Sequence, residues 1–451
     1  MNFRRLDFAH EWELYGENIR TEFTQCLEEG KDVEQYRAEV EAIEQMQRSL
    51  EKEARADKLF YEFLNAPQRA DYPYEEPSDY EGILAARPKN RKAYKKPAAD
   101  DKLYDQVYGA WLGRICGCLL GKPVEGLKSE EIERLCKAEG NFPLSRYMGS
   151  EPEAVIRAGL DEGRKEYLQK CYKPGYMPAD DDTNYTCMAA MKVIDIFGRE
   201  FAPDDMAHTW LNSQPMSAYC TAERVAFMNF ATAIAPPESA IYKNAFREWI
   251  GAQIRGGYFG YICPGDPEAA ARMAFNDACI SHVKNGIYGE MFIAAALAAA
   301  AVTDDMPEIL QAGLNEIPEK SRLAEDVGNV MKWYREGVSK EETFKRIHTQ
   351  WDEYSGHDWC HTNSNAMIVA AVLLYGGMDY GKTICMAVET GFDTDCNGAT
   401  AGSILGMVKG REAIGPEWYE AIDDQVETSI VGLGTYKLAE LAALTMKHIG
   451  A

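Results

Sequence analysis

Small residues recur at every fourth position in two widely separated stretches of this chain. The first stripe is Gly109, Gly113 and Gly117, and the second runs over 398–406 in GATAGSILG. A spacing of four puts these residues on one face of a helix, where their small size lets helix backbones approach closely. The stripes therefore predict tightly packed helices.

Helical patterning continues from about residue 102 to the C-terminus, and strand-like alternation of apolar and polar residues is rare. The expected fold is one compact all-α domain. Its predicted helices lie at roughly 103–120, 183–197, 218–232, 268–282, 286–302, 308–315, 323–336, 340–349, 363–375, 380–390, 397–408 and 435–448.

The first hundred residues differ from the rest and predict a boundary between an N-terminal helical extension with its linker (1–100) and the all-α domain (101–451). From Val33 and Val40 onward, apolar residues recur at spacings of three and four up to about residue 65, which predicts one amphipathic helix. Two interpretations stay open: an arm packed on the main body, or an arm that joins two copies into a homodimer. The basic, Pro-containing stretch 86–101 is expected to be a linker.

Bulk properties exclude several classes of protein. A formal net charge of −24 argues against a nucleic-acid-binding surface and against attraction to anionic membranes. The longest apolar run, 291–302, is too short to span a bilayer, and the N-terminus holds no apolar signal-peptide core. The 12 cysteines form no CxxC pair, which predicts free thiols in a reducing cytoplasm.

Two acidic clusters come directly before apolar helical patterns. Asp180, Asp181 and Asp182 lie in PADDDTNYT, and Asp393 and Asp395 lie in GFDTDCNGATAG. Carboxylates this close repel one another unless a hard cation lies between them, and an oxygen-only set favours Mg²⁺ or Mn²⁺ over zinc. Helix capping is the alternative for either cluster alone, although one cap needs only one carboxylate.

A third segment, GRICGCLLGKPVEG (113–126), follows the first small-residue stripe. Its Gly-rich helix is expected to end at Gly121, because Pro123 breaks it. Glu125 then projects from the turn.

Together these segments resemble the ADP-ribosylglycohydrolase family over residues 104 to 435. The stretch 117–125 matches the family's GxxxGDALGxPxE helix, 180–183 its T-D-D-T element, 281–282 its His-bearing segment and 392–396 its G-D-T-D-T element. The resemblance implies an all-α fold with a centre of two Mg²⁺ (or Mn²⁺) ions.

The resemblance also implies roles for individual residues. Asp181, Asp182, Asp393 and Asp395 would be metal ligands, and Glu125 would lie at the boundary between metal and substrate. Either Glu125 or Asp182 would move the proton during hydrolysis.

Three metal-site positions depart from the family pattern. Asp180 stands where a Thr is expected and remains a hard oxygen ligand. Cys396 replaces the last Thr of G-D-T-D-T, and Cys118 replaces the Asp of G-D-A-L-G. Because thiol sulfur is a poor Mg²⁺ ligand, one coordination place passes to water or to Asn397.

The substrate side is less complete. The family's G-N-G-x-x-x-R loop is missing before the matched histidine, and the next Asn-Gly pair is its partial substitute. Polar residues near aromatic or Gly-rich segments are further predicted contacts, with core packing or helix capping as the alternatives. The predicted substrate-binding residues are Arg255, His282, Asn285, Gly286, His361 and Asn363.

The sequence thus predicts a Mg²⁺-dependent hydrolase that releases ADP-ribose, or a related ribosyl group, from a protein side chain or a small conjugate. One alternative is a non-catalytic structural relative, as certain jellyfish crystallins are. Another is an HD-type phosphohydrolase using His357-Asp358 with His282, His348 or His361, which leaves 180–182 unexplained.

Overall fold

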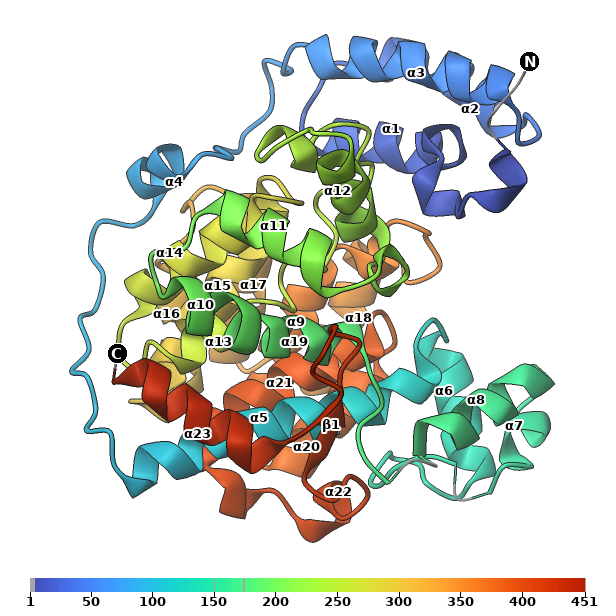
Figure 1. Cartoon of the computed structure of the whole chain (residues 1–451). Coiled ribbons are helices and arrows are strands. Elements are labelled where there is room, and N and C mark those ends of the chain that lie inside the picture. Colours follow the sequence, from blue (N-terminus) through green and yellow to red (C-terminus); the bar gives the residue numbers. More distant parts are fainter. Residues whose placement is uncertain (1–4, 150, 173–174, 451) are drawn as a thin grey trace.

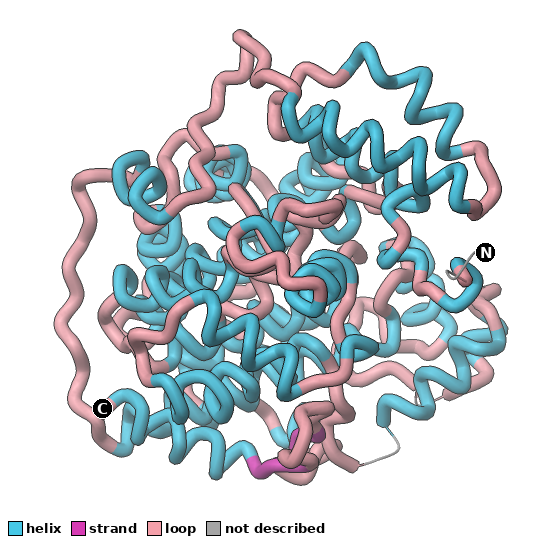
Figure 2. Tube along the Cα trace, turned by 45° about the horizontal axis from the view of Figure 1, so that its top comes forward, coloured by secondary structure: helices cyan, strands magenta, loops and turns pink. Residues whose placement is uncertain are grey.

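The computed structural model describes residues 5–149, 151–172 and 175–450. Helices dominate these ranges, and their strands are confined to one short antiparallel pair, β1 (Gln425–Glu427) and β2 (Thr435–Lys437) (Figure 2). The predicted all-α fold is confirmed.

The N-terminal region comprises α1 (Ile19–Glu28), α2 (Arg37–Glu44), α3 (Leu50–Asn65) and α4 (Tyr80–Ala86). The helices of the main body are α5 (Asp101–Gly121), α6 (Ser129–Ala138), α7 (Ala154–Arg157), α8 (Glu162–Tyr172), α9 (Asp181–Met188), α10 (Asp195–Phe197), α11 (Pro203–Ser213), α12 (Thr221–Ala231), α13 (Gly257–Tyr261), α14 (Pro267–Ala278), α15 (Asn285–Ala300), α16 (Met306–Leu314), α17 (Arg322–Arg335), α18 (Lys340–Gln350), α19 (Thr362–Tyr375), α20 (Tyr380–Glu389), α21 (Thr394–Lys409), α22 (Pro416–Tyr419) and α23 (Leu438–Ile449).

The two small-residue stripes face each other. A Cβ atom added to Gly113 would lie 2.1 Å from the carbonyl oxygen of Gly402, and one added to Gly402 would lie 2.3 Å from that of Gly113. Gly117 meets Gly398 in the same way, at 2.0 Å. Partner numbers rise on one helix as they fall on the other, so α5 and α21 run antiparallel with their backbones in contact.

This pairing brings the end of α5 to the start of α21. The Thr394 hydroxyl donates a hydrogen bond to the carbonyl of Gly121 at 2.9 Å. A short 3-10 turn, Lys122–Val124, follows α5 and ends it where Pro123 was expected to. The matched segments at 117–125 and 392–396 are therefore neighbours in space.

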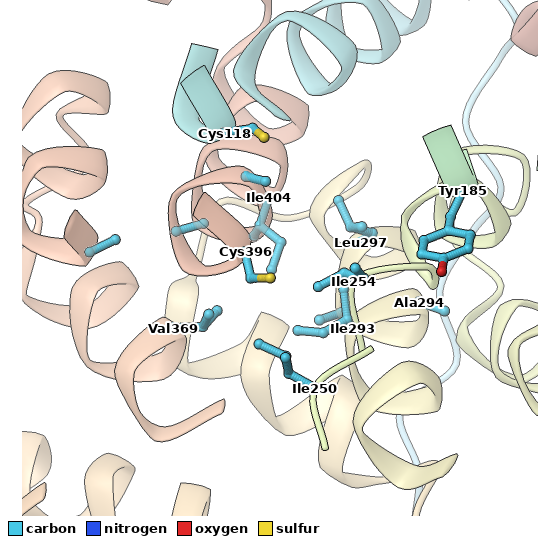
Figure 3. Packing of buried hydrophobic residues seen from close by; sticks show 14 of the residues in the cluster. Cys118, Tyr185, Ile250, Ile254, Ile293, Ala294, Leu297, Val369, Cys396 and Ile404 are labelled. Atoms are coloured by element: carbon cyan, nitrogen blue, oxygen red, sulfur yellow. The ribbon is translucent and has the colours of Figure 1, made fainter. Parts of the chain in front are cut away.

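Two apolar helices, α15 and α19, form much of the surrounding core. Every residue of α15 is buried, as expected for a helix that is apolar all round. Figure 3 shows Ile293 and Leu297 of α15 beside Cys396 and Ile404 of α21. The acidic segment before α21 is therefore held on a close-packed base.

The single amphipathic helix predicted between residues 32 and 65 is wrong. The chain forms α2 and α3 instead, because the Ser49 hydroxyl caps α3 by accepting from the backbone N–H of Lys52. Val40 and Ile43 then pack against Phe60 and Phe63 in a separate apolar cluster. Since this apolar face is buried within the chain, it gives the predicted homodimer no support.

The basic stretch after α4 runs as an extended segment along one side of the body to α5 (Figure 1). Arg87 and Arg91 pair with Glu316 at 2.6 and 2.9 Å, and Lys92 pairs with Glu308 at 2.7 Å. This linker is therefore fixed to the surface by ion pairs.

Several helices were not predicted, notably α6, α8 and α11. The sequences of α6 and α8 are rich in charge, with glutamates at 130, 131 and 133 and a Glu-Gly-Arg-Lys-Glu run from 162. Only a few residues of α6 and α8, such as Ile132, Leu135 and Leu168, are buried against the body. Tertiary packing outweighs weak local patterning here.

No helix in the described ranges has the length and apolarity to cross a membrane. The cysteines are free thiols, as the sequence predicted. The division at residue 100 stays a prediction.

Replacing Gly113 with Ala should force α5 and α21 apart, because the new methyl group meets the Gly402 carbonyl. We expect a loss of about 2 to 4 kcal/mol in the free energy of unfolding, measured with urea. Gly328 in α17 has nothing within 4 Å of its Cβ position. The matched Gly328→Ala variant should be neutral or gain up to about 1 kcal/mol. Equal effects of the two changes would contradict the close-contact interpretation.

Candidate active site and metal centre

Both acidic clusters lie at helix starts, and the structure brings them together. Asp180 is the N-cap of α9 and accepts from the backbone N–H of Asp182 at 2.9 Å. Asp393 is the N-cap residue of α21, but its side chain makes no capping hydrogen bond. Capping therefore accounts for one carboxylate of the first cluster and for none of the second.

Carboxylates from both helices share two groups of closely spaced ligand atoms. Atoms of Cys118, Asp180, Asp182 and Asp395 lie within 4.8 Å of one another, and so do atoms of Asp393, Asp395 and Cys396. Asp395 belongs to both groups. This arrangement suits two ions that share a ligand.

Several of these oxygens are buried without a hydrogen-bond partner. They are both carboxylate oxygens of Asp182 and the Oδ1 atoms of Asp393 and Asp395. Their side chains are at most 4% exposed. Leaving buried carboxylate oxygens unpaired costs free energy that a bound cation would offset.

The electrostatics agree with a cation site. Burial, with Asp180 and Asp395 close by, raises the pKa of Asp181 to about 8. Burial and Asp180 raise the pKa of Asp395 to about 6. The pKa of Glu125 is raised well above its usual range, first by Asp395 and then by burial. Without a cation, protonation of some of these carboxyl groups removes the repulsion between them.

Two basic residues compensate part of this charge. Lys122 Nζ lies 2.5 Å from Asp180 Oδ2, and despite burial this ion pair lowers the pKa of Asp180. Arg114, fully buried in α5, donates to the backbone carbonyl of Asp182 at 3.2 Å. Lys122 thus balances the carboxylate that stands in place of the family's Thr, and both oxygens of Asp180 already have partners.

The thiols at this site remain protonated. Burial raises the pKa of Cys118 and Cys396 well above the usual range, and nearby aspartates raise both further. Cys360 Sγ donates to Asp393 Oδ2 at 3.4 Å. Neutral thiols add no charge to the cluster, so the carboxylates remain its hard ligands.

A cavity of about 420 Å³ opens beside these carboxylates. Its walls combine carboxyl groups with aromatic rings and come from segments far apart in the chain. The lining residues are Glu11, Trp12, Asn18, Thr21, Glu125, Asp181, Cys220, Thr221, Glu223, Phe246, Trp249, Ile250, Gly251, Ile254, Gly356, Trp359, Cys360, Asp393, Asp395 and Cys396.

Arg255, a predicted substrate contact, lies behind the wall of this cavity. It is 1% exposed and pairs with Glu223 at 2.9 Å and with Asp277 at 3.1 Å. Glu223 itself lines the cavity. Arg255 therefore fixes the position of a lining carboxylate, and its predicted contact with substrate gains no support.

The remaining predicted substrate residues also lie outside the lining. His282 borders a separate cavity of about 410 Å³, with Phe275 and Ile287. Asn285 bonds to Glu76 at 2.8 Å, and the start of α15 packs so closely that a Cβ on Gly286 would lie 2.6 Å from a backbone oxygen. These roles stay predictions, without support from this placement.

Asn363 and His361 lie at the start of α19, where both are fully buried. Asn363 donates to Asp326 at 2.8 Å, and His361 stacks on Trp351 with ring centroids 4.9 Å apart. Neither lines the cavity. The neighbouring Asn365 accepts from the backbone N–H of Asp393 at 3.2 Å and so holds the second acidic cluster in place.

Glu28, His357 and His361 form a third group of closely spaced ligand atoms. The indole N–H of Trp249 donates to His357 Nδ1 at 3.0 Å, and the backbone N–H of Asn363 donates to His361 Nδ1 at 3.1 Å. Because each Nδ1 accepts a hydrogen bond, the ring proton lies on Nε2, which faces Glu28 at 3.2 Å in His357 and 3.4 Å in His361 and has no lone pair there for a metal. This argues against the HD-type phosphohydrolase.

No pattern in the sequence marks Glu223, Glu11, Trp12 or Cys220 as lining residues. Glu223 lies in α12, an ordinary amphipathic helix without a motif. Trp249 and Trp359 fall in segments whose aromatic and polar content did indicate a pocket. An N-terminal segment reaches the cavity only through tertiary packing, so its local sequence does not indicate that it lines a site.

Comparisons with known proteins identify the family. The family model described as ADP-ribosylglycohydrolase matches residues 99–448. Among solved structures, an ADP-ribosylglycohydrolase-related protein complex is 18% identical, with the match covering 78% of this chain and 99% of that chain at a TM-score of 0.46. No curated protein matches the chain. Since the family model spans well over half of the sequence, the protein belongs to the ADP-ribosylglycohydrolase family.

Proposed function

We propose that this protein is a divalent-metal-dependent hydrolase that cleaves the glycosidic bond of an ADP-ribosyl or related ribosyl conjugate. The observation that carries the proposal is the meeting of unpartnered, buried carboxylates from α9 and α21 beside one cavity. Family membership indicates glycohydrolase chemistry. The metal, Mg²⁺ or Mn²⁺, and the individual roles below are part of the proposal.

Asp182, Asp393 and Asp395 would hold the metal ions, since each has a buried oxygen without a partner. Asp181, which lines the cavity, would complete the set of ligands. Asp180 would contribute only where its ion pair with Lys122 opens. When bound, such ions hold adjacent ribose hydroxyls and polarise a water molecule.

Glu125 would move the proton. It lines the cavity, and its pKa is raised by Asp395 and by burial. It is absent from the groups of closely spaced ligand atoms. A carboxyl group that is not committed to metal and has a raised pKa suits general acid and base catalysis near neutral pH.

Metal binding should strengthen as pH rises. Since the folded protein holds protons on Asp181 up to about pH 8 and on Asp395 up to about pH 6, it binds more protons than the unfolded chain above about pH 4. The metal-free protein should therefore lose stability between about pH 4 and pH 8. Thermal unfolding with EDTA and with MgCl₂ or MnCl₂ should show the larger metal-induced rise in Tm at pH 8 than at pH 6. A pH-independent rise would contradict the cluster as the binding site.

Asp182→Asn should weaken metal binding at least about tenfold in titration calorimetry, because it removes one charged ligand from the first group. The metal-free variant should unfold at a temperature no lower than the wild type, since a repelling buried charge is lost. Asp304→Asn changes an exposed carboxylate elsewhere and is the control. Unchanged metal affinity in Asp182→Asn would contradict Asp182 as a metal ligand.

Glu125→Gln should separate proton transfer from metal binding. We expect kcat for a ribosyl substrate to fall about 100- to 10,000-fold, with metal affinity changed less than about threefold. Steady-state kinetics on labelled ADP-ribosyl and ribosyl conjugates, beside calorimetry, would measure both. Loss of metal affinity in proportion to kcat would assign Glu125 to the ligands instead.

A further inference from the structure

The N-terminal region, which lies almost entirely outside the family-matched residues 99–448, forms part of the cavity wall. Buried ion pairs hold it there. Arg247 pairs with Glu22 at 2.9 Å and with Glu29 at 2.6 Å, and all three side chains are at most 5% exposed. Arg247 lies between the lining residues Phe246 and Trp249, so α1 and this part of the wall are held together.

Two more contacts fix the same region over the cavity. Glu13 pairs with Arg224 of α12 at 2.6 Å, next to the lining residue Glu223. Glu28 accepts a hydrogen bond from His357 at 3.2 Å. In the sequence, His357 lies between the lining residues Gly356 and Trp359. Burial opposes the charge of Glu28, but the hydrogen bond from His357 and the charge of Arg322 hold its pKa below the usual range.

Residues 11–21 therefore border the cavity as a fixed wall. Within it, Asn18 donates to the backbone carbonyls of Glu11 and Leu14 at 2.9 and 3.0 Å, which shapes the turn that carries Trp12. Glu11 is exposed, whereas Asp393 and Asp395 are buried. The cavity thus runs from a buried acidic end to a mouth bordered by Glu11 and Trp12.

The charge of this cavity is one-sided. Among the described residues that line it there is no lysine or arginine, while six carry carboxyl groups: Glu11, Glu125, Asp181, Glu223, Asp393 and Asp395. Arg255 pairs with Glu223 from behind and shares its charge with Asp277. Two divalent ions, with Lys122 and Arg114 nearby, would about balance the acidic centre and leave no positive excess for a diphosphate. Phosphate groups would lose hydration without gaining a cationic partner.

The aromatic residues of the cavity indicate that it binds a positively charged group. Trp12, Phe246, Trp249 and Trp359 line the same space, and Trp249 packs edge-on against both Phe246 and Trp359, with ring centroids 4.8 and 6.3 Å apart. Indole faces attract cations, and carboxylates beside them add to that attraction.

We propose that the cavity takes a ribosyl conjugate without phosphate groups, whose planar, positively charged leaving group binds Glu11 and Trp12 of the N-terminal region together with Trp249 and Trp359. The ribosyl half of this proposal rests on the proposed function. The subsite for the leaving group rests on the cavity alone.

Hydrolysis of such a conjugate balances with one water molecule. A new C1′–O bond forms, and the C1′–N bond breaks with its electron pair passing to nitrogen. The leaving group departs uncharged, and one proton is released. Because the leaving nitrogen already carries positive charge, it needs no protonation to depart.

Binding of aglycone analogues to the full-length protein tests the subsite without turnover. Quenching of tryptophan fluorescence would compare 1-methylnicotinamide, a planar cation, with uncharged nicotinamide, in MgCl₂ and in EDTA. We expect the cation to bind about tenfold more tightly in either buffer. In competition, ADP-ribose should displace the cation no better than ribose does.

Variants locate the effect. Glu11→Gln should weaken binding of 1-methylnicotinamide about three- to tenfold and leave nicotinamide unchanged. Glu41→Gln, an exposed change in α2 of the same region, should alter neither. Equal binding of cation and neutral analogue, or displacement by ADP-ribose at least tenfold better than by ribose, would overturn the proposal. Absent metal binding and absent ribosyl hydrolysis, with the cation preference retained, would instead overturn the proposed function alone.

Discussion

Backbone contact between α5 and α21 is the constraint on which the rest of this structure depends. Glycines at 113 and 117 meet glycines at 402 and 398 so closely that no side chain fits between them. The contact fixes the distance, direction and register of the two helices at once. It also decides what lies at their ends, because the turn that carries Glu125 then lies against the segment that carries Asp393 and Asp395. The buried guanidinium of Arg114 adds the start of α9 to the same place.

Bringing these helix ends together places several carboxyl groups close to one another, and their mutual repulsion opposes folding. Without cations, protonation reduces the repulsion between the carboxyl groups, as the raised pKa values of Asp181 and Asp395 indicate. The chain limits the cost by pairing Asp180 with Lys122 and by keeping the adjacent thiols neutral. A stable fold therefore tolerates a cluster whose oxygens are still free to bind something positive.

Much of this could be read from the sequence, for physical reasons. Glycine spacing and apolar periodicity are local properties, so the α5 and α21 stripes and most helices of the body were predictable. The paired Asp elements were predictable because closely spaced carboxylates need an explanation wherever they occur. The break at Ser49 was missed because the apolar period continues through it. Glu223, Glu11 and Trp12 were missed because their position depends on contacts between distant segments. The burial of Arg255 was not predictable either, because its ion pairs with Glu223 and Asp277 leave no trace in its local sequence.

The touching glycine backbones also bear on how a protein like this can diverge. Two helices separated by side chains can slide or tilt when one residue changes size, and the site drifts with them. Two helices whose carbonyls rest on bare Cα atoms have no such adjustment, so inserting or deleting a residue in either one would turn the carboxylates beyond it away from their partners. Divergence in such a fold therefore has to occur in segments that pack around these two helices, and the first hundred residues of this chain are such a segment.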